Sequence, residues 1–236
     1  MYKFLPSYVG SKSFWVPKLE EFRGLDFIEP FCGSAVISAN LARTAVLNDL
    51  DDKLYQILSN FKDLICPESF SSEDYEKYKW DKDWWKYVYC LQKMSFSGVF
   101  RYSKNGYNVP IKSNMKGKSV SLTKEFQEAQ ERMKELNPVI ANLDYCDIPH
   151  KAFCNRVAVF DPPYQGSQAS YNGAFDYVQY WEFIKDVVPL CEVAIVFDRL
   201  SNLENRFDKE IQTRKMVVNG KHKPDTEAMV IIDNRL

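Results

Sequence analysis

Segments typical of buried β-strands alternate with helical segments in two separate parts of the chain, and this alternation restricts the possible folds more than any other feature. In the first part the order is helix, strand, helix, strand, helix, over residues 11–22, 25–31, 35–41, 44–48 and 51–61. In the second part the order is strand, strand, helix, strand, over residues 139–145, 156–160, 177–188 and 193–197. Such alternation predicts an α/β protein with a doubly wound, mainly parallel sheet. Residues 211–218 and 228–232 are expected to add an antiparallel pair at its edge.

The stretch between these two parts, residues 62–138, lacks the strand–helix alternation and is rich in polar and aromatic residues. Its Asn105-Gly106 dipeptide is a strong signal for a hairpin turn between two short strands. We therefore predict that 62–138 form an inserted subdomain, mainly helical with one β-hairpin. The sheet domain would then consist of 1–61 and 139–236.

Local signals predict where the helices of this subdomain begin and end. Ser71 with Asp74 is a capping pair that opens one helix. Thr123 is expected to cap a long polar helix that reaches Leu136 and is stopped by Pro138. Three tryptophans are expected to form the core of the subdomain rather than a surface on which bases stack; they are Trp80, Trp84 and Trp85.

Composition excludes several classes of protein. The chain has 236 residues, of which 45% are hydrophobic, so it can bury a substantial core. No apolar run approaches the roughly 18 residues of a membrane span. The six cysteines show no C-x-x-C spacing, and neither histidine lies near a nucleophile or another ligand, so we expect a cytoplasmic protein without a metal site or a Ser-His-Asp triad. Because the formal net charge is −1, contacts with phosphate groups would require a local basic patch.

A four-residue motif, Asp161-Pro162-Pro163-Tyr164, directly follows the apolar strand-like run 157–160. At the end of a buried parallel strand, these residues lie at an edge of the sheet. The carboxylate of Asp161 and the carbonyl of Pro162 can accept hydrogen bonds from a flat amino group, and the ring of Tyr164 can stack on the same group. This chemistry suits the exocyclic amine of a nucleobase.

The ends of the first two predicted strands carry acids that suit other parts of a ligand. Glu29 ends the strand over 25–31 and can attract an ammonium group. Gly33 follows it, and a glycine at this point lets the backbone approach a ligand closely. Asp49 ends the second strand, where an acid can accept hydrogen bonds from both ribose hydroxyls. The sequence is not G-x-G-x-x-G, which argues against a dinucleotide.

The segment before the first helix adds groups for the remaining parts of such a ligand. Gly10 and Lys12 can place a backbone amide and an ammonium group near a carboxylate. Tyr8 and Phe31 can lie near a sulfonium, which aromatic rings attract through cation–π interaction. A molecule with an amino-acid end, a sulfonium, a ribose and an adenine is S-adenosyl-L-methionine (SAM), and we predict it as the cofactor.

With these motifs in this order, the chain resembles the Dam-like (D12 class) DNA adenine-N6 methyltransferases, which include phage and bacterial enzymes. The resemblance covers nearly the whole chain. Its motifs lie at residues 8–12, 29–33, 48–49, 97–102 with 105–110, 143–147, 161–164 and 226–231. The sequence departs from the family pattern at Ser11, at Ser97 and at 110–113, so GATC is not expected as the recognised site.

The resemblance implies a Rossmann-like class I methyltransferase sheet with an inserted, mainly helical target-recognition subdomain. On this basis 1–61 and 139–236 bind SAM and catalyse the reaction, and 62–138 recognise DNA. Asp144 and Tyr145 fall where the family places residues around the adenine of the cofactor. The methyl group would pass directly to N6 of an adenine flipped out of the duplex, with Asp161, Pro162 and Tyr164 as the catalytic residues.

Basic side chains interleaved with tyrosines near the predicted hairpin are the candidate DNA surface. The DNA-binding candidates are Arg101, Tyr102, Lys104, Asn108, Lys112 and Lys116, with Lys118 and Tyr107 next to them. Lys112 or Lys116 could replace the basic residue that reads guanine in GATC-specific members, although lysine lacks the bidentate fork of arginine.

Other functions remain open from the sequence. One is methylation of another amino group, on cytosine N4, RNA adenine or protein glutamine. Another is a catalytically silent relative that only binds DNA. An aspartate at position 161 together with the family-like hairpin favours DNA adenine.

Overall fold

A seven-stranded sheet forms the centre of the computed structural model, which describes residues 1–8, 10–164, 175–218 and 221–235. Its strands lie in the order β10 (Ile211–Val218), β11 (Lys221–Asp233), β9 (Val193–Arg199), β8 (Val157–Phe160), β1 (Asp26–Glu29), β2 (Thr44–Asn48) and β7 (Val139–Ala141). Strand β11 runs antiparallel to both of its neighbours, and the other pairs are parallel. The predicted α/β fold and the antiparallel pair at the edge are therefore confirmed.

Strand order places a crevice at the carboxyl ends of β1 and β8. From β1 the chain proceeds outward to β2 and β7, and it then returns to add β8 and β9 on the other side of β1. In doubly wound sheets ligands bind at such a reversal of strand order. The predicted strand-end acids meet this edge: Glu29 is the last residue of β1, and Asp49 and Asp161 directly follow β2 and β8.

Both faces of the sheet are covered, which explains why β8, in its centre, is apolar at every position. In β8, Val157 and Val159 pack into one core, whereas Ala158 and Phe160 pack into the other. The first face is covered by η1 (Val16–Phe22), α1 (Val36–Leu41) and α2 (Asp52–Ser59). The second face is covered by η6 (Tyr145–Asp147), η7 (His150–Phe153), α6 (Tyr177–Val187) and α7 (Leu200–Glu204), with η8 (Val188–Leu190) after α6. Alternating side chains on a buried strand face opposite sides of the sheet.

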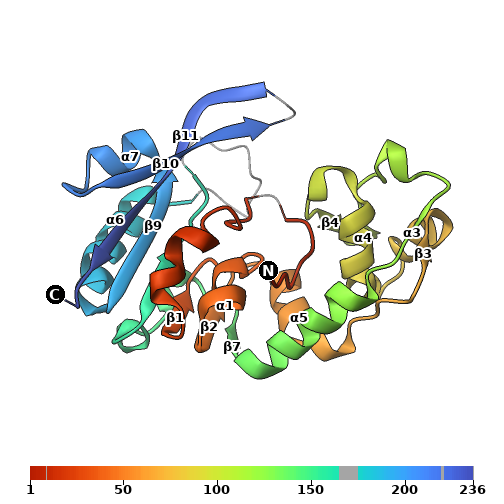
Figure 1. Ribbon diagram of the computed structural model, residues 1–236, viewed down its shortest axis with the longest axis horizontal. Coiled ribbons are helices and arrows are strands. Elements are labelled where there is room, and N and C mark those ends of the chain that lie inside the picture. Colours follow the sequence, from red (N-terminus) through yellow and green to blue (C-terminus); the bar gives the residue numbers. More distant parts are fainter. Residues whose placement is uncertain (9, 165–174, 219–220, 236) are drawn as a thin grey trace.

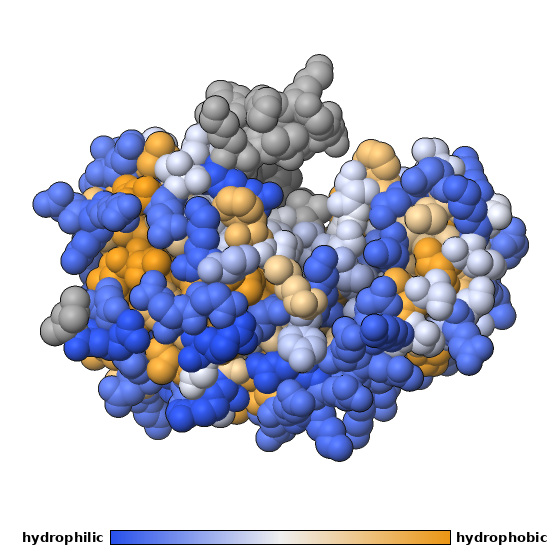
Figure 2. Space-filling view, in the orientation of Figure 1, coloured by the Kyte–Doolittle hydropathy of each residue, from blue (hydrophilic) through white to orange (hydrophobic). Residues whose placement is uncertain are grey.

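Residues between α2 and β7 form the helical part seen at the right of Figure 1, apart from the sheet. Its helices are η2 (Phe61–Asp63), α3 (Ser72–Tyr78), η3 (Trp84–Tyr87), α4 (Val88–Met94), η4 (Phe96–Gly98), η5 (Ser113–Met115) and α5 (Thr123–Leu136). Its short strands are β3 (Phe70–Ser71), β6 (Ser119–Val120), β4 (Tyr102–Ser103) and β5 (Gly106–Tyr107). The N-terminal segment passes between this part and the sheet, and Figure 2 shows this face of the molecule notched between the two.

Several local predictions are confirmed and others need correction. The capping box of Ser71 and Asp74 is present, and β4 and β5 form the expected hairpin. Its central residues, however, are Lys104 and Asn105, because Gly106 already pairs with Ser103. Thr123 is the first residue of α5 and gives it no side-chain cap. Trp84 and Trp85 are buried as predicted, but Trp80 is 53% exposed, so its assignment to the core was wrong.

Several predicted elements are shorter in the structure, among them the strand expected over 25–31, which is limited to Asp26–Glu29. The helix expected over 11–22 is a 3-10 helix limited to Val16–Phe22. The strand expected over 139–145 ends at Ala141, because the side chain of Asn48 fixes the next residues in a loop. Its amide donates to the carbonyl of Leu143 at 3.0 Å and its oxygen accepts from the Leu143 amide at 2.9 Å.

Candidate active site

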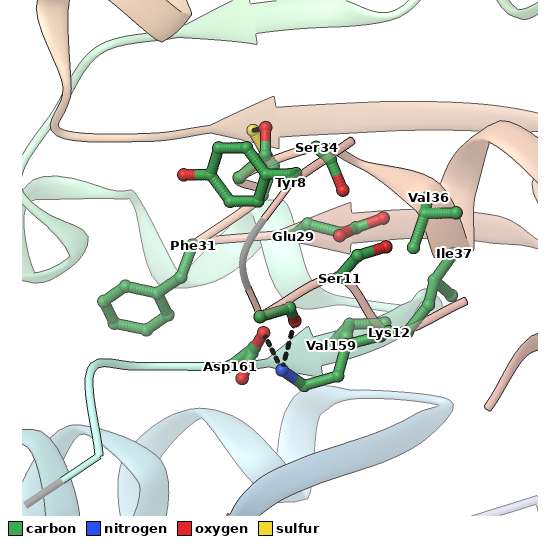
Figure 3. Close-up of a pocket in the computed structure, with 13 residues that line it drawn as sticks. Tyr8, Ser11, Lys12, Glu29, Phe31, Ser34, Val36, Ile37, Val159 and Asp161 are labelled. Atoms are coloured by element: carbon green, nitrogen blue, oxygen red, sulfur yellow. Dashed lines mark hydrogen bonds and ion pairs between the residues drawn. The ribbon is translucent and has the colours of Figure 1, made fainter. Parts of the chain in front are cut away.

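A pocket of about 310 Å³, including space open to solvent, lies at the crevice between β1 and β8. It is lined by strand-end residues, by the start of α1 and by the N-terminal segment (Figure 3). Seven predicted site residues line it: Tyr8, Gly10, Lys12, Glu29, Phe31, Gly33 and Asp161. Val9 of the same N-terminal motif lies outside the described residues. The parallel strands bring Glu29, Phe31, Gly33 and Asp161 together because their carboxyl ends meet at one edge, and the N-terminal segment adds the other three residues.

Glu29 lies in the middle of the pocket, between Tyr8 and the pair formed by Lys12 and Asp161 (Figure 3). Its side chain is buried, and one carboxylate oxygen accepts the amide of Ser38, in α1, at 2.8 Å. Burial raises the pKa of Glu29 to about 7, and the negative charge of Asp161 adds to this effect. An ionised Glu29 therefore favours a positively charged ligand group beside it.

Glu29 should make folding stability depend on pH. Its pKa is about 7 in the folded chain, against an ordinary value of 4.5. The stabilisation that Glu29 gives is therefore complete below about pH 4.5 and is lost as the pH rises through 7. This difference corresponds to about 3 kcal/mol. Glu29→Gln should therefore reduce the difference in unfolding free energy between pH 5 and pH 8, measured by urea titration. The exposed Glu182→Gln should behave like the unmodified chain, and an unchanged pH dependence in Glu29→Gln would contradict the burial of an ionisable Glu29.

Asp49 is not among the residues that line the pocket, but a backbone amide joins it to Gly33, which is. Gly33 donates to one carboxylate oxygen at 2.9 Å and Asp51 to the other at 3.0 Å. Burial raises the pKa of Asp49 to about 6, although both hydrogen bonds favour the ionised form. Gly33 adopts φ of +48°, and a Cβ at this position would lie 3.1 Å from the Tyr8 ring. Glycine is therefore favoured at this position, both by its positive φ and by the closeness of the Tyr8 ring.

Asp161, at the carboxyl end of β8, forms an ion pair with Lys12. The Lys12 ammonium lies 2.7 Å from Asp161 Oδ2 and donates to the carbonyl of Gly10 at 2.8 Å. This partner differs from the cofactor carboxylate that we predicted for Lys12. Burial raises the pKa of Asp161, and Lys12 opposes this shift. For Lys12 burial alone would lower the pKa, but the two carboxylates near it raise the pKa above its usual value.

Glu227 is the second acid on Lys12, and we gave it no role from the sequence. Its Oε1 lies 3.3 Å from the Lys12 ammonium and accepts the Tyr164 hydroxyl at 3.0 Å, and its Oε2 accepts the Trp15 indole at 2.9 Å. Because β11 runs antiparallel, its residue Glu227 lies beside Arg199, at the carboxyl end of β9. The available signal was its place in the motif at 226–231, directly before the strand predicted over 228–232.

The remaining catalytic candidates lie next to Asp161. Pro162 is buried, and Tyr164 is half-buried with the Lys12 ammonium 5.4 Å from the centre of its ring. The Tyr177 hydroxyl donates to the carbonyl of Pro163 at 2.7 Å. The turn after β8 is therefore anchored at Pro163 and at the Tyr164 hydroxyl.

Tyr145 and Phe31 belong to an aromatic cluster beside the pocket. Their ring centres are 5.2 Å apart, and Tyr180 contacts both rings. Tyr145 is buried, whereas Asp144 is exposed and accepts the amide of Cys146 at 3.0 Å, so it caps η6. Because Phe31 also lines the pocket, it connects the pocket to the cluster around Tyr145, which is predicted to hold the adenine of the cofactor.

The DNA-binding candidates divide into exposed residues and residues with partners inside the protein. Tyr102 donates to Asp51 at 2.9 Å, and Lys112 donates to the Lys93 carbonyl at 2.6 Å. Burial lowers the pKa of Lys112. Arg101 is exposed and donates to Asn108, to the side chain at 2.9 Å and to the carbonyl at 2.8 Å. The lysines at the surface are Lys104, Lys116 and Lys118.

Within the described part of the chain, no helix is long and apolar enough to cross a membrane. No group of three or more side chains that bind metals comes together among the same residues. The strand order, the single antiparallel strand and the site at the carboxyl edge define a Rossmann-like class I methyltransferase fold.

Comparisons with known proteins find similarity in structure only. No protein-family model matches the chain, and no curated protein matches it in sequence. The 23S rRNA methyltransferase ErmE matches with a TM-score of 0.45 and 12% identity, over 97% of this chain and 70% of that chain. SMU.1697c from Streptococcus mutans, in complex with SAH, matches with a TM-score of 0.38 and 9% identity, over 92% and 93%. An rRNA methylase from Streptococcus thermophilus matches with a TM-score of 0.38 and 8% identity, over 92% and 91%.

Proposed function

We propose that this protein transfers a methyl group from SAM to N6 of an adenine in DNA. The observation that carries this proposal is Asp161 at the carboxyl end of β8, in one pocket with the buried acid Glu29. Such a transfer requires one acid that can face the amino group to be methylated. It also requires a second acid that can bind the positively charged cofactor. In this proposal residues 1–61 and 139–236 hold the cofactor and 62–138 recognise DNA.

The residues at the pocket fit SAM on two grounds. Burial raises the pKa values of Glu29 and Asp49. A cationic ligand beside these two acids would favour their ionised forms, and the ionised forms would in turn favour its binding. Gly33 allows the backbone to approach a ligand without a side chain. Glu29 would bind the ammonium group, Asp49 the ribose hydroxyls, and the aromatic cluster with Tyr145 the adenine.

SAM supplies an electrophilic methyl group when it is bound. Asp161 and the Pro162 carbonyl would accept hydrogen bonds from the N6 amino group, which directs its lone pair towards the pocket. Tyr164 would stack on the flipped adenine, and its hydroxyl bond to Glu227 would hold the ring in place. As N6 forms its bond to the methyl carbon, the bond between that carbon and the sulfonium sulfur would break, with its electron pair left on sulfur. The hydrogen bonds to Asp161 would strengthen during this transfer, and Asp161 would accept the proton that N6 loses.

Transfer of tritium from labelled SAM to DNA of random sequence, followed by mapping of the modified bases, tests this proposal. Label on adenine N6 in DNA is expected. Label on cytosine or on RNA alone would instead favour methylation of another amino group. Binding of DNA without any label would favour a silent DNA-binding relative.

The exposed Arg101 should contribute to DNA affinity. Arg101→Ala is expected to weaken binding and to reduce the slope of log K against log salt by about 1, because one phosphate contact is lost. Fluorescence anisotropy over a salt titration measures both quantities. The control is Arg43→Ala, which removes an exposed arginine paired with Asp26 on β1. Equal slopes for Arg101→Ala and the unmodified chain would remove Arg101 from the DNA surface.

A further inference from the structure

Lys12 is a buried cation with three oxygen partners. Its ammonium lies 2.7 Å from Asp161, 2.8 Å from the carbonyl of Gly10 and 3.3 Å from Glu227, and only 7% of its side chain is exposed. Burying a charge is costly unless it is paired. Lys12 therefore needs a carboxylate partner in every state of the site.

The proposed reaction makes a conflicting demand on Asp161. The Oδ2 atom of Asp161 that faces Lys12 belongs to the carboxylate that would accept hydrogen bonds from the substrate amino group. If Lys12 kept its full contact with Asp161, the amino group would compete with a full positive charge for that carboxylate. Charge-assisted hydrogen bonds are stronger than neutral ones, so the substrate would be the weaker competitor.

We propose that Glu227 is a positioning residue that receives Lys12 when the substrate amino group binds Asp161. This inference rests on the proposed function. The Lys12 ammonium lies between the two acids, and the distance to Glu227 exceeds the distance to Asp161 by only 0.6 Å, from 3.3 and 2.7 Å. A small movement of one side chain would thus exchange partners without leaving the cation unpaired.

The environment of Glu227 suits this role because it fixes the carboxylate before Lys12 arrives. Trp15 donates to Oε2 at 2.9 Å and Tyr164 to Oε1 at 3.0 Å. Burial opposes ionisation of Glu227, but Lys12 and these two hydrogen bonds outweigh it, so the pKa of Glu227 lies below its usual value. Since Tyr164 also follows Asp161 in the turn after β8, Glu227 orients both the cation and the ring beside the substrate.

Two variants test the exchange of partners. Glu227→Gln keeps the size of the side chain but removes its charge, so Lys12 remains on Asp161, and the single-turnover rate should fall about 100-fold with unchanged SAM affinity. Lys12→Met with Glu227→Gln removes the competing cation, so at pH 8.5 the double variant should be at least about tenfold faster than Glu227→Gln alone. A purely structural role predicts the opposite, since two changes in one buried cluster would add their damage. The control Arg214→Gln alters a residue 4.0 Å from Glu227 and should keep the native rate.

Each outcome decides a separate question. If the unmodified chain transfers no methyl group to DNA, the proposed function fails. If it does transfer but Glu227→Gln is as fast, or the double variant is as slow as the single one, only the role of Glu227 fails. Should Glu227→Gln not fold, a crystal structure of the unmodified chain with sinefungin and duplex DNA decides. Lys12 should then lie within hydrogen-bond distance of Glu227 and beyond 4 Å, roughly the limit of an ion pair, from Asp161; an unchanged Lys12–Asp161 contact would overturn the inference.

Discussion

Replacing Asp161 with asparagine is expected to reduce methyl transfer by at least about 10²–10³-fold while SAM binding stays nearly unchanged. The amide keeps the shape of the carboxylate, but it offers one acceptor and no negative charge to the N6 amino group. The hydrogen bonds that strengthen during transfer would therefore be lost. Tritium incorporation in a single turnover measures the rate, and isothermal titration measures binding of SAM.

The folded state should tolerate this change. Burial raises the pKa of Asp161, so a neutral side chain at this position costs less than it would at an exposed ion pair, and Lys12 retains Glu227 as a partner. Asp186→Asn, an exposed change on α6, is the matched control. Transfer at the native rate by Asp161→Asn would show that this acid does not hold the amino group.

The sheet could be predicted from the sequence because its strands carry unambiguous local signals. In β8 and β9 every residue from Val157 to Phe160 and from Val193 to Phe197 is buried, since each face of the sheet meets a core. Continuous apolar runs of this length therefore marked buried strands correctly. The sequence pattern fails where a contact between distant residues determines the end of a strand. Asn48 ends β7 early by binding Leu143, which lies 95 residues away.

The strand-end acids could be predicted as neighbours for a similar reason. Parallel strands bring their carboxyl ends to one edge, so Glu29 and Asp161 had to lie close together once the strands were known. The partners of Lys12 could not be predicted in this way. They depend on the register of β11, which is fixed by its pairing with β9 and places Glu227 against Arg199. A shift of β11 by two residues would keep the same side chains on each face, so the burial pattern does not specify which residue lies opposite Arg199.

The exposure of Trp80 has a comparable origin in a contact between distant segments. The hairpin passes so close to the backbone of Lys79 and Trp80 that a Cβ on Gly106 would lie 2.2 Å from the Lys79 carbonyl oxygen. The Tyr107 amide donates to this same oxygen at 2.7 Å. The backbone of Gly106 thus occupies the space beside Lys79, whereas the ring of Trp84, which is buried, contacts the Tyr107 ring with centres 5.3 Å apart.

Gly106→Ala is therefore expected to detach the hairpin from the helical part of the molecule. Gly106 has φ of +130°, which side chains rarely adopt, and the atom in its way is backbone that cannot move aside. We expect a loss of about 3 kcal/mol or more in unfolding free energy. If the hairpin contacts DNA as proposed, DNA affinity should fall at least about tenfold, which is 1.4 kcal/mol, while SAM affinity is retained.

Gly117→Ala is the control, at a second glycine of the same part of the chain. Gly117 also has positive φ, at +67°, but nothing lies within 4 Å of the position of its Cβ. This variant should cost only the strain of a left-handed residue, about 1–2 kcal/mol, and should keep its affinity for DNA. Urea titration and DNA binding by anisotropy compare the two variants directly. Equal losses in both would show that positive φ alone, rather than the close approach to Lys79, makes Gly106 necessary, and DNA binding retained in Gly106→Ala would remove the hairpin from the interface.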